Sequence, residues 1–273
     1  MRAAALLIAV ASNVLDLAML RGPINELQQR GAQINAARFA VDLAVPISVN
    51  QAKCMMRNGY SVIFMRLYAP YQSGVADPHA CDNIRNALSA GVIISGYMTP
   101  EPNSVKTGAE QFDEMYTNLK NNQIYLRNIW IQVTSPINWS ANTTVNINFV
   151  NSILFRAEQN GINTGIFTNF YDWSQIMGSA AVSNASLWYW NTYGAGESNE
   201  TPPIFEDFRP FGGWTQPTIK QFAQVETVCG AIVNRDVFVP SESVGGVVRG
   251  IEDRNALLWS LAEERIIPRK STN

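Results

Sequence analysis

Apolar runs of strand length alternate with amphipathic segments of helical length along most of this chain, and this alternation is the feature that most constrains its fold. The pattern predicts five strand–helix units in succession. Strands that are joined through helices lie parallel, with right-handed crossovers. The expected strands lie at about 39–44, 60–68, 92–98, 128–134 and 165–169, and the expected helices at about 48–58, 78–90, 104–121, 144–159 and 171–177.

The alternation of strands and helices stops after the fifth unit. Three more strands are expected, at about 186–192, 219–223 and 231–238, and no long helix separates them. Five parallel units and three further strands together provide the eight strands of a closed barrel. The sequence therefore predicts an α/β fold, an irregular TIM-like barrel of about (β/α)5 followed by three further strands.

The barrel is expected to be a single domain over residues 37–240, with an extension at each end. The C-terminal tail, 241–273, carries an amphipathic pattern that predicts a helix at about 248–265. The N-terminal extension, 1–36, has two interpretations. Its apolar run from Ala3 to Ala11 is typical of a short signal peptide of about residues 1–11, and it is also compatible with an amphipathic helix.

Four Asn-x-Ser/Thr sequons add support for export, at Asn138, Asn142, Asn184 and Asn199. Such sequons accept glycans in secreted proteins. We therefore expect an extracellular location.

Composition excludes several classes of function. With 47% hydrophobic and 15% charged residues, the chain can bury a substantial core. The net charge of −2, without a cluster of basic residues, argues against nucleic acid as a partner. The apolar segments are too short or too interrupted to span a membrane. A single histidine, His79, and the lack of Cys-x-x-Cys spacing argue against a metal site, and we expect a monomer without a cofactor.

Three cysteines, Cys54, Cys81 and Cys229, allow one disulfide and one free thiol. Cys54 lies in the first predicted barrel helix and Cys81 early in the second, so both are expected near the same end of neighbouring helices. Cys229 precedes the last strand and is expected at the opposite end. The topology thus predicts a Cys54–Cys81 bridge.

Functional side chains in such barrels gather at the C-terminal ends of the strands. Because successive strand residues alternate between faces, inward-pointing residues can be named from the sequence. Asp42 ends the first strand, Gln132 and Thr134 share a face of the fourth, and Asn234 shares a face of the last strand with Asp236. Aromatic residues on strands belong to the core more often than to ligand sites. The expected ligand contacts are Arg66, Tyr68, Tyr97, Glu101, Trp130, Trp188, Trp190 and Asp236.

Several of these segments resemble the family 25 glycoside hydrolases, which are lysozymes. Phe39-Ala40-Val41-Asp42-Leu43 is similar to the family's first strand, residues 129–134 lie where the family has an Asp-x-Glu strand, and residues 233–238 resemble its closing Val-Asp-x-Asn/Asp-x-Phe. Four further segments are similar to the nematode branch of this family: YSVIFMRLY, the Gly-Tyr-Met of the third strand, LWYWNTYG and FGGWTQPTIKQF. The resemblance covers about 38–239 and depends on the order and spacing of these short motifs.

The resemblance implies a catalytic site that departs from the family pattern. Gln132 and Thr134 replace the family's strand-four carboxylates, and Asn234 replaces its last-strand aspartate. Asp42 is the family carboxylate that this chain retains. Glycoside hydrolysis needs a proton donor and a second carboxylate, and loss of the acid alone lowers the rate by roughly 10²–10⁴-fold. We therefore expect a secreted lysozyme-like protein that binds bacterial cell-wall glycan or another N-acetylated sugar, or acts in innate defence, with a degenerate catalytic site.

Two alternatives stay open at this point. The first is an active muramidase that uses Asp42 with a relocated acid, either Glu101 or Asp236. The second is a secreted signalling or immune effector without a glycan ligand, which would have a mouth filled by packed side chains. Asp172, between Tyr171 and Trp173, is interpreted as a helix cap.

Overall fold

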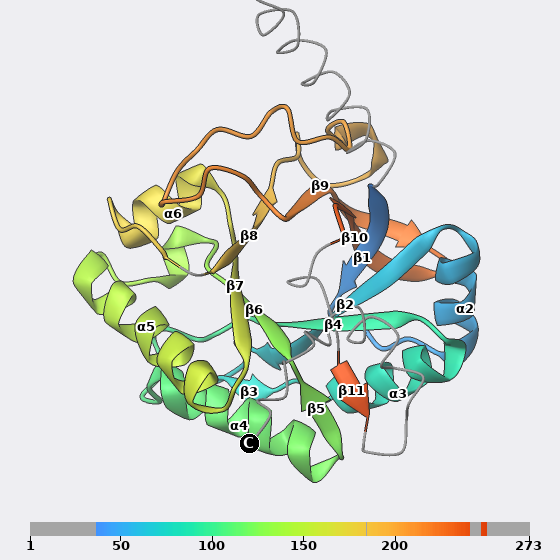
Figure 1. The fold of residues 1–273 in the computed structure, drawn as a ribbon, viewed down its shortest axis with the longest axis horizontal. Coiled ribbons are helices and arrows are strands. Elements are labelled where there is room, and N and C mark those ends of the chain that lie inside the picture. The colour runs from blue at the N-terminus through green and yellow to red at the C-terminus, as the bar shows by residue number, and fades with distance from the viewer. Residues whose placement is uncertain (1–36, 184, 241–246, 250–273) are drawn as a thin grey trace, which may run out of the picture. The chain divides into compact units, whose positions relative to one another are not determined.

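Eight strands close into a barrel in the computed structural model, which describes residues 37–183, 185–240 and 247–249 (Figure 1). This confirms the predicted fold, and each of the eight expected strands is present. The expected extension at 1–36 lies outside the described residues. In barrel order the strands are β1 (Arg38–Leu43), β2 (Tyr60–Ala69), β4 (Ile93–Met98), β6 (Asn128–Gln132), β7 (Asn163–Thr168), β8 (Ser186–Trp190), β9 (Ile219–Val228) and β10 (Ala231–Phe238).

Seven of these strands run parallel, and β10 runs antiparallel to both of its neighbours, β9 and β1. The register places Arg38 opposite Phe238 and Asp42 opposite Asn234. We call the end of the barrel at which the seven parallel strands terminate the mouth. Because β10 is reversed, its first residues lie at the mouth.

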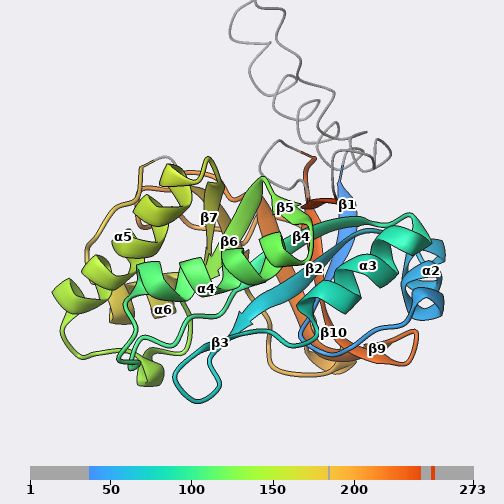
Figure 2. The same ribbon diagram turned by 90° about the horizontal axis from the view of Figure 1, so that it is seen from below.

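Five helices cover the outside of the barrel (Figures 1 and 2). Two of them begin with a capping box, in which Ser48 pairs with Gln51 and Thr107 with Glu110. No described helix is long and apolar enough to cross a membrane. In chain order the helices are α2 (Val49–Arg57), α3 (Ala80–Ala90), α4 (Gly108–Asn121), α5 (Thr143–Gln159) and α6 (Phe170–Met177).

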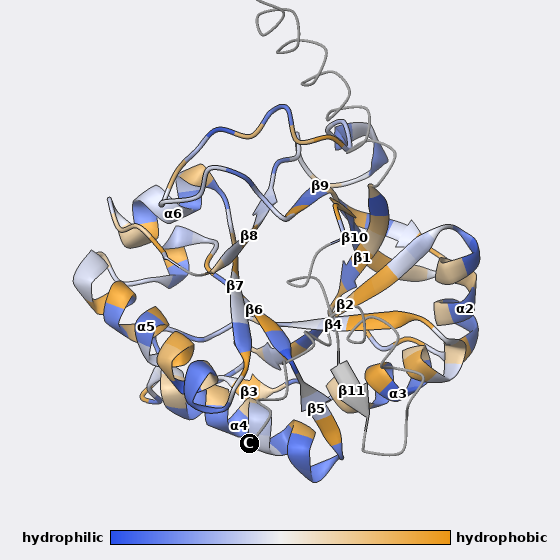
Figure 3. Ribbon diagram, viewed as in Figure 1, coloured by the Kyte–Doolittle hydropathy of each residue, from blue (hydrophilic) through white to orange (hydrophobic). Residues whose placement is uncertain are grey.

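Apolar side chains fill the space between strands and helices and also the inside of the barrel. Figure 3 shows β2 largely in the hydrophobic colour, as expected for a strand that is buried on both faces. Inside, the Trp188 ring packs on Phe64 and Phe167 at centroid distances of 4.6 and 4.5 Å. Gly165 leaves room for the Trp130 ring, because a Cβ there would lie 2.3 Å from Trp130 Cζ3. The barrel is therefore a packed core below its mouth.

The long connection between β8 and β9 has no α-helix and is held by a buried lysine. Lys220 Nζ donates to the carbonyls of Pro202 and Ile204 at 2.8 and 3.1 Å and to Asp207 Oδ2 at 2.7 Å. The Asp207 carboxylate also accepts hydrogen bonds from Tyr189 and Asn191. A buried ammonium is tolerated when it is paired in this way, so the loop is fixed to the barrel wall.

Three short strands were not expected from the sequence. β3 (Val75–Ala76) extends the sheet beside β2, and β5 (Ile124–Leu126) pairs with β11 (Val247–Arg249). The predicted tail helix is therefore wrong at residues 248 and 249, where the backbone is extended and bonded to β5. The remainder of that predicted helix lies outside the described residues.

The predicted disulfide is wrong: Cys54 is bonded to Cys229, and Cys81 is a free, buried thiol. The error came from the direction of the last strand. Cys229 lies in the turn between β9 and the reversed β10, which places it at the mouth, beside α2. Gln51 of α2 donates to Gly230 in the same turn at 3.3 Å, whereas Cys81 is packed in the core between strands and helices.

Replacement of both bonded cysteines in the double variant Cys54→Ser, Cys229→Ser should lower the free energy of unfolding by about 2–5 kcal/mol, because the crosslink restricts the unfolded chain. Urea denaturation without reductant measures this change. Alkylation in denaturant without reductant should label Cys81 alone. A Cys54–Cys81 linked peptide in a non-reducing digest would contradict the assignment.

Candidate functional site

A cavity of about 410 Å³ opens at the mouth, a volume within the usual range of ligand sites. We call it the mouth pocket. It combines amides, hydroxyls, one carboxylate and aromatic rings, contributed by the ends of β6, β7 and β8, the middle of β9, the start of α6 and the loop after β6. Its described lining residues are Gln132, Thr134, Ser135, Phe167, Tyr171, Asp172, Trp190 and Gln224.

Gln132 and Thr134 form a neutral hydrogen-bonded chain on the pocket wall. The Thr99 hydroxyl donates to Gln132 Oε1 at 2.6 Å, and Gln132 Nε2 donates to Thr134 Oγ1 at 3.1 Å. These contacts fix the orientation of the Gln132 amide. An amide and a hydroxyl offer hydrogen bonds to a ligand, but neither can donate a proton as an acid at neutral pH.

Asp172 is the single carboxylate among the described lining residues. Trp190 Nε1 donates to its Oδ2 at 3.1 Å. Burial raises the pKa of Asp172, while hydrogen bonds from the Trp190 side chain and the Ser135 backbone act in the opposite direction. The predicted role of Asp172 as a helix cap is wrong, because the cap is Asn169, whose Oδ1 accepts from the Asp172 backbone N–H at 2.7 Å.

Asp42 lies behind the pocket wall and is 2% exposed. Gln221 Nε2 donates to its Oδ2 at 2.6 Å, and Asn234 Nδ2 donates to its Oδ1 at 2.9 Å. Gln224, which lines the pocket, donates to Gln221 Oε1 at 2.6 Å. Two amide side chains therefore connect Asp42 to the pocket and separate it from a ligand there.

Asp42 and Asp236 form a pair of buried carboxyls inside the barrel. Burial raises the pKa of Asp42 to about 6, even though hydrogen bonds from Asn234, Gln221 and Asp236 act in the opposite direction. Burial, followed by the charge of Asp42, raises the pKa of Asp236 well above its ordinary range. Trp188 Nε1 donates to Asp236 Oδ1 at 2.9 Å. Two adjacent carboxyls in a low-dielectric site disfavour double ionisation, so Asp236 retains the proton more strongly.

The remaining polar candidates are engaged elsewhere. Arg66 Nε donates to the buried Asp77 at 2.7 Å and its Nη2 to the Tyr71 hydroxyl at 2.6 Å. Tyr68 faces α4, where its hydroxyl donates to Glu114 at 3.1 Å. Glu101 is partly buried in the loop after β4 and accepts from the Asn103 backbone N–H at 3.0 Å. None of these predicted contact residues is among the described residues that line the mouth pocket.

The predicted aromatic contacts lie at two depths. Trp190 ends β8 and lines the mouth pocket, where Tyr171 adds a ring that is 63% exposed. Trp130, Trp188 and Tyr97 are buried in the interior cluster, with Trp188 in edge-on contact with both of the others. A ligand in the mouth pocket therefore meets Trp190, while the deeper rings support the floor of the barrel.

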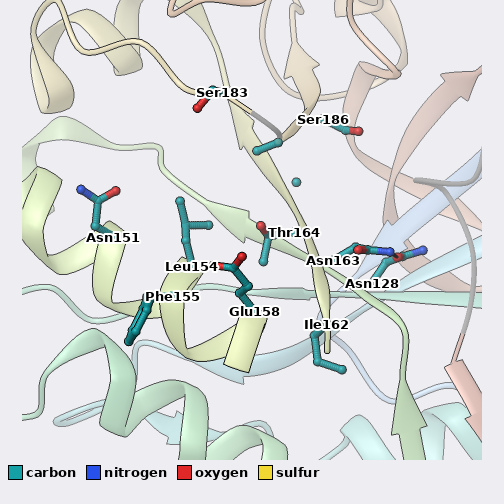
Figure 4. A pocket seen from close by; sticks show the side chains of 12 residues that line it. Asn128, Asn151, Leu154, Phe155, Glu158, Ile162, Asn163, Thr164, Ser183 and Ser186 are labelled. Carbon is teal, nitrogen blue, oxygen red and sulfur yellow. Dashed lines mark hydrogen bonds between the residues drawn. The ribbon is translucent and has the colours of Figure 1, made fainter. Parts of the chain in front are cut away.

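A second, larger cavity of about 680 Å³ lies at the opposite end of the barrel (Figure 4). Figure 4 shows Leu154, Phe155 and Glu158 of α5 on one side and Asn128, Asn163 and Ser186, at the starts of β6, β7 and β8, on the other. Function in α/β barrels gathers where the parallel strands end. The mouth pocket is thus the better candidate despite its smaller volume.

Sequence comparison agrees with this architecture. The family model of lysozyme-like protein 1 matches residues 33–222. The chain belongs to the lysozyme-like protein family. Lysozyme-like protein 2 of Caenorhabditis elegans is 51% identical over 201 residues, covering 73% of this chain and 72% of the relative. Lysozyme-like protein 1 of the same organism is 49% identical over 203 residues, covering 74% of this chain and 68% of the relative.

The relationship extends to family 25 glycoside hydrolases. A probable family 25 lysozyme of Dictyostelium discoideum is 28% identical over 200 residues, covering 72% of this chain and 89% of the relative. A muramidase from Trichobolus zukalii has the same fold, with a TM-score of 0.57, 20% identity, and coverage of 75% of this chain and 95% of that one. A family 25 lysozyme from Aspergillus fumigatus has a TM-score of 0.54 at 15% identity, covering 76% of this chain and 96% of that one. The lysozyme-like chain therefore has the fold of peptidoglycan hydrolases.

Sequence reasoning missed the residues that complete the lysozyme-like pocket. Gln224 lies on β9, which was expected to end at residue 223 but continues to Val228. Asp172 and Tyr171 come from the first turn of α6, whereas the predicted contacts lie on strands or, for Glu101, in the loop after the third predicted strand, and Asp172 was interpreted as a helix cap. A positive φ of 60° at Ser135, which places its backbone N–H near Asp172, has no sequence signature in a non-glycine residue.

The pH dependence of stability should report the buried Asp42. Its pKa is raised from 3.8 to about 6, so the folded state binds this proton more tightly than the unfolded chain does. The resulting stabilisation is complete below the ordinary pKa and is lost as the pH rises through about 6, a change on the order of 3 kcal/mol. In Asp42→Asn the free energy of unfolding should fall less steeply between about pH 4 and pH 7.

Urea denaturation across this pH range, on wild type and Asp42→Asn, makes the measurement. Asp82→Asn removes a carboxyl that is 79% exposed on α3 and is the matched control. Parallel curves for wild type and Asp42→Asn would show that Asp42 does not titrate in this way.

Proposed function

We propose that this chain is a secreted lysozyme-like protein that binds N-acetylated glycan, such as that of bacterial cell walls, with little or no hydrolysis, and that it acts in innate defence. The observation that carries the proposal is the wall of the mouth pocket. Gln132 and Thr134 lie there, at the positions that the family resemblance assigns to carboxylates. Asp42 is separated from the pocket by Gln221 and Gln224.

The chemistry of glycoside cleavage supports the absence of turnover. An acid must protonate the leaving oxygen while a second carboxylate stabilises or traps the developing positive charge on the sugar. The two catalytic carboxyls must both reach the scissile bond. The described pocket wall offers one carboxylate, Asp172, while Asp42 and Asp236 are buried in the barrel.

The composition of the pocket supports retention of a sugar ligand. Amide and hydroxyl groups at Gln132, Thr134 and Gln224 can pair with sugar hydroxyls and acetamido groups, and Tyr171 and Trp190 offer aromatic faces to the apolar side of a sugar ring. A cavity of about 410 Å³ at the mouth also favours a ligand-binding protein over an effector with a filled barrel.

The disulfide supports the proposed location. Such bonds persist in oxidising compartments and are rare in the cytosol. The Cys54–Cys229 bond joins α2 to the β9–β10 turn, two segments that are 175 residues apart in the sequence. An extracellular defence role would require this kind of reinforcement against unfolding.

A second candidate function is that of an active muramidase with a relocated acid. The position of Asp172 favours this candidate. Its carboxyl lines the pocket next to Gln132 and Thr134, and burial raises its pKa, as is common for general acids. Asp42 would then act from behind Gln221, after a rearrangement of that amide. The two candidates differ in whether the wild-type protein cleaves glycan.

Wild-type protein should bind soluble oligosaccharides of N-acetylglucosamine and N-acetylmuramic acid whose lactyl groups are amide-linked, in a calorimetric titration, without releasing new reducing ends. The double variant Gln132→Asp, Thr134→Glu restores two carboxylates to the pocket wall. It should bind as well as wild type and gain turnover, since general acid catalysis contributes roughly 10²–10⁴-fold in rate. Gln132→Asn, Thr134→Gln places amides of matching size at the same positions and is the control.

Turnover by wild-type protein that is abolished in Asp172→Asn or Asp42→Asn would overturn the proposal in favour of the second candidate. Failure of both wild type and the restored variant to bind any N-acetylated oligosaccharide would refute glycan binding itself.

A further inference from the structure

The mouth pocket carries a negative charge with no positive charge to balance it among its described lining residues. Asp172 is its carboxylate, and the other lining side chains are neutral amides, hydroxyls and aromatic rings. A carboxylate in a pocket of this kind accepts hydrogen bonds from a ligand and repels anions. The charge of Asp172 therefore influences which sugars can bind in the mouth pocket.

Local contacts hold Asp172 as an acceptor. The Trp190 indole N–H donates to Oδ2 at 3.1 Å. This donor fixes the orientation of the carboxyl and favours its ionised form, against the burial that raises the pKa of Asp172.

Two cations near this end of the barrel, Arg66 and Lys220, are already engaged. Arg66 is paired with the buried Asp77 and bonded to Tyr71, and Lys220 is bonded to Asp207 and two carbonyls of the β8–β9 connection. Behind the pocket, Asp42 is linked to the lining residue Gln224 through Gln221. The groups that surround the pocket thus add negative rather than positive charge.

We propose that Asp172 makes the mouth pocket selective for uncharged N-acetylated sugar units and excludes units with a free carboxylate. The proposal rests on the glycan-binding function above and specifies its ligand. In cell-wall glycan, an N-acetylmuramic acid unit is uncharged at its lactyl group when that group is amide-linked to peptide, and anionic when the peptide has been removed. The pocket would distinguish these two states, and it would also accept chains of N-acetylglucosamine.

The size of the discrimination follows from electrostatics. Two like charges a few ångströms apart in a partly desolvated pocket repel strongly enough to change affinity by about tenfold or more. Because this repulsion acts through charge, high salt should weaken it. Asp172 can also accept a hydrogen bond from an N–H or O–H group of a neutral sugar.

Calorimetric titration with two tetrasaccharides tests the proposal. Both alternate N-acetylglucosamine with N-acetylmuramic acid, and they differ in whether the lactyl carboxylates are free or amidated. Wild type should bind the amidated form about tenfold more tightly or better. Asp172→Asn should bind the two forms within about threefold of each other, and Asp172→Glu, which keeps the charge, should restore the preference.

Glu158→Gln removes a carboxylate at the cavity on the opposite end of the barrel and should retain the wild-type preference. Repetition of the wild-type titrations at high salt gives a test that needs no variant, since the preference should shrink. Binding of both sugars with no preference in wild type, or a preference that persists in Asp172→Asn or at high salt, would overturn the selectivity and leave glycan binding intact. Failure to bind either sugar would overturn both.

Discussion

The antiparallel pairing of β10 with β1 closes the barrel and determines what lies at its mouth. Pairing in this direction places Asn234 opposite Asp42, so the amide reaches the carboxylate at 2.9 Å. It also brings the β9–β10 turn to the mouth, where Cys229 bonds to Cys54 of α2. A parallel last strand would move both residues to the other end. The site and the crosslink thus depend on one choice of strand direction.

Burial of two carboxyls inside this closed barrel shapes the electrostatics of the site. Asp42 and Asp236 are both withdrawn from water, and the charge of one raises the pKa of the other. Such a pair is tolerated because polar donors surround it: Gln221 and Asn234 bond to Asp42, and Trp188 bonds to Asp236. Gln221 and Asn234 also take one lone pair on each oxygen of Asp42, which a substrate or water would otherwise use. Stabilisation of the buried pair and access to it are therefore opposed.

The sequence was sufficient to predict the eight strands and five helices of the barrel, because apolar periodicity and helix caps are local signals. It also identified Gln132, Thr134 and Trp190, which line the pocket. Strand direction is not local, so the partner of Cys54 was mispredicted. The depth of an aromatic residue is not local either: Trp188 and Trp190 are two residues apart on the same face, yet one is fully buried and the other lines the pocket. Asp172 was missed for a similar reason, since only the fold brings the start of α6 next to the end of β6.

Asn234 connects the buried Asp42 to the backbone of β9. Its Nδ2 donates to Asp42, and its Oδ1 accepts from the backbone N–H of Val225 at 2.9 Å, where β9 has a positive φ of 56°. An aspartate at 234 could still accept from Val225, but it could donate to Asp42 only in its protonated form. It would add a third carboxyl to a buried pair that already disfavours double ionisation. With Asp42 bonded to Gln221, an amide at 234 is the side chain that satisfies both neighbours, while Gln132, Thr134 and Asp172 line the mouth pocket.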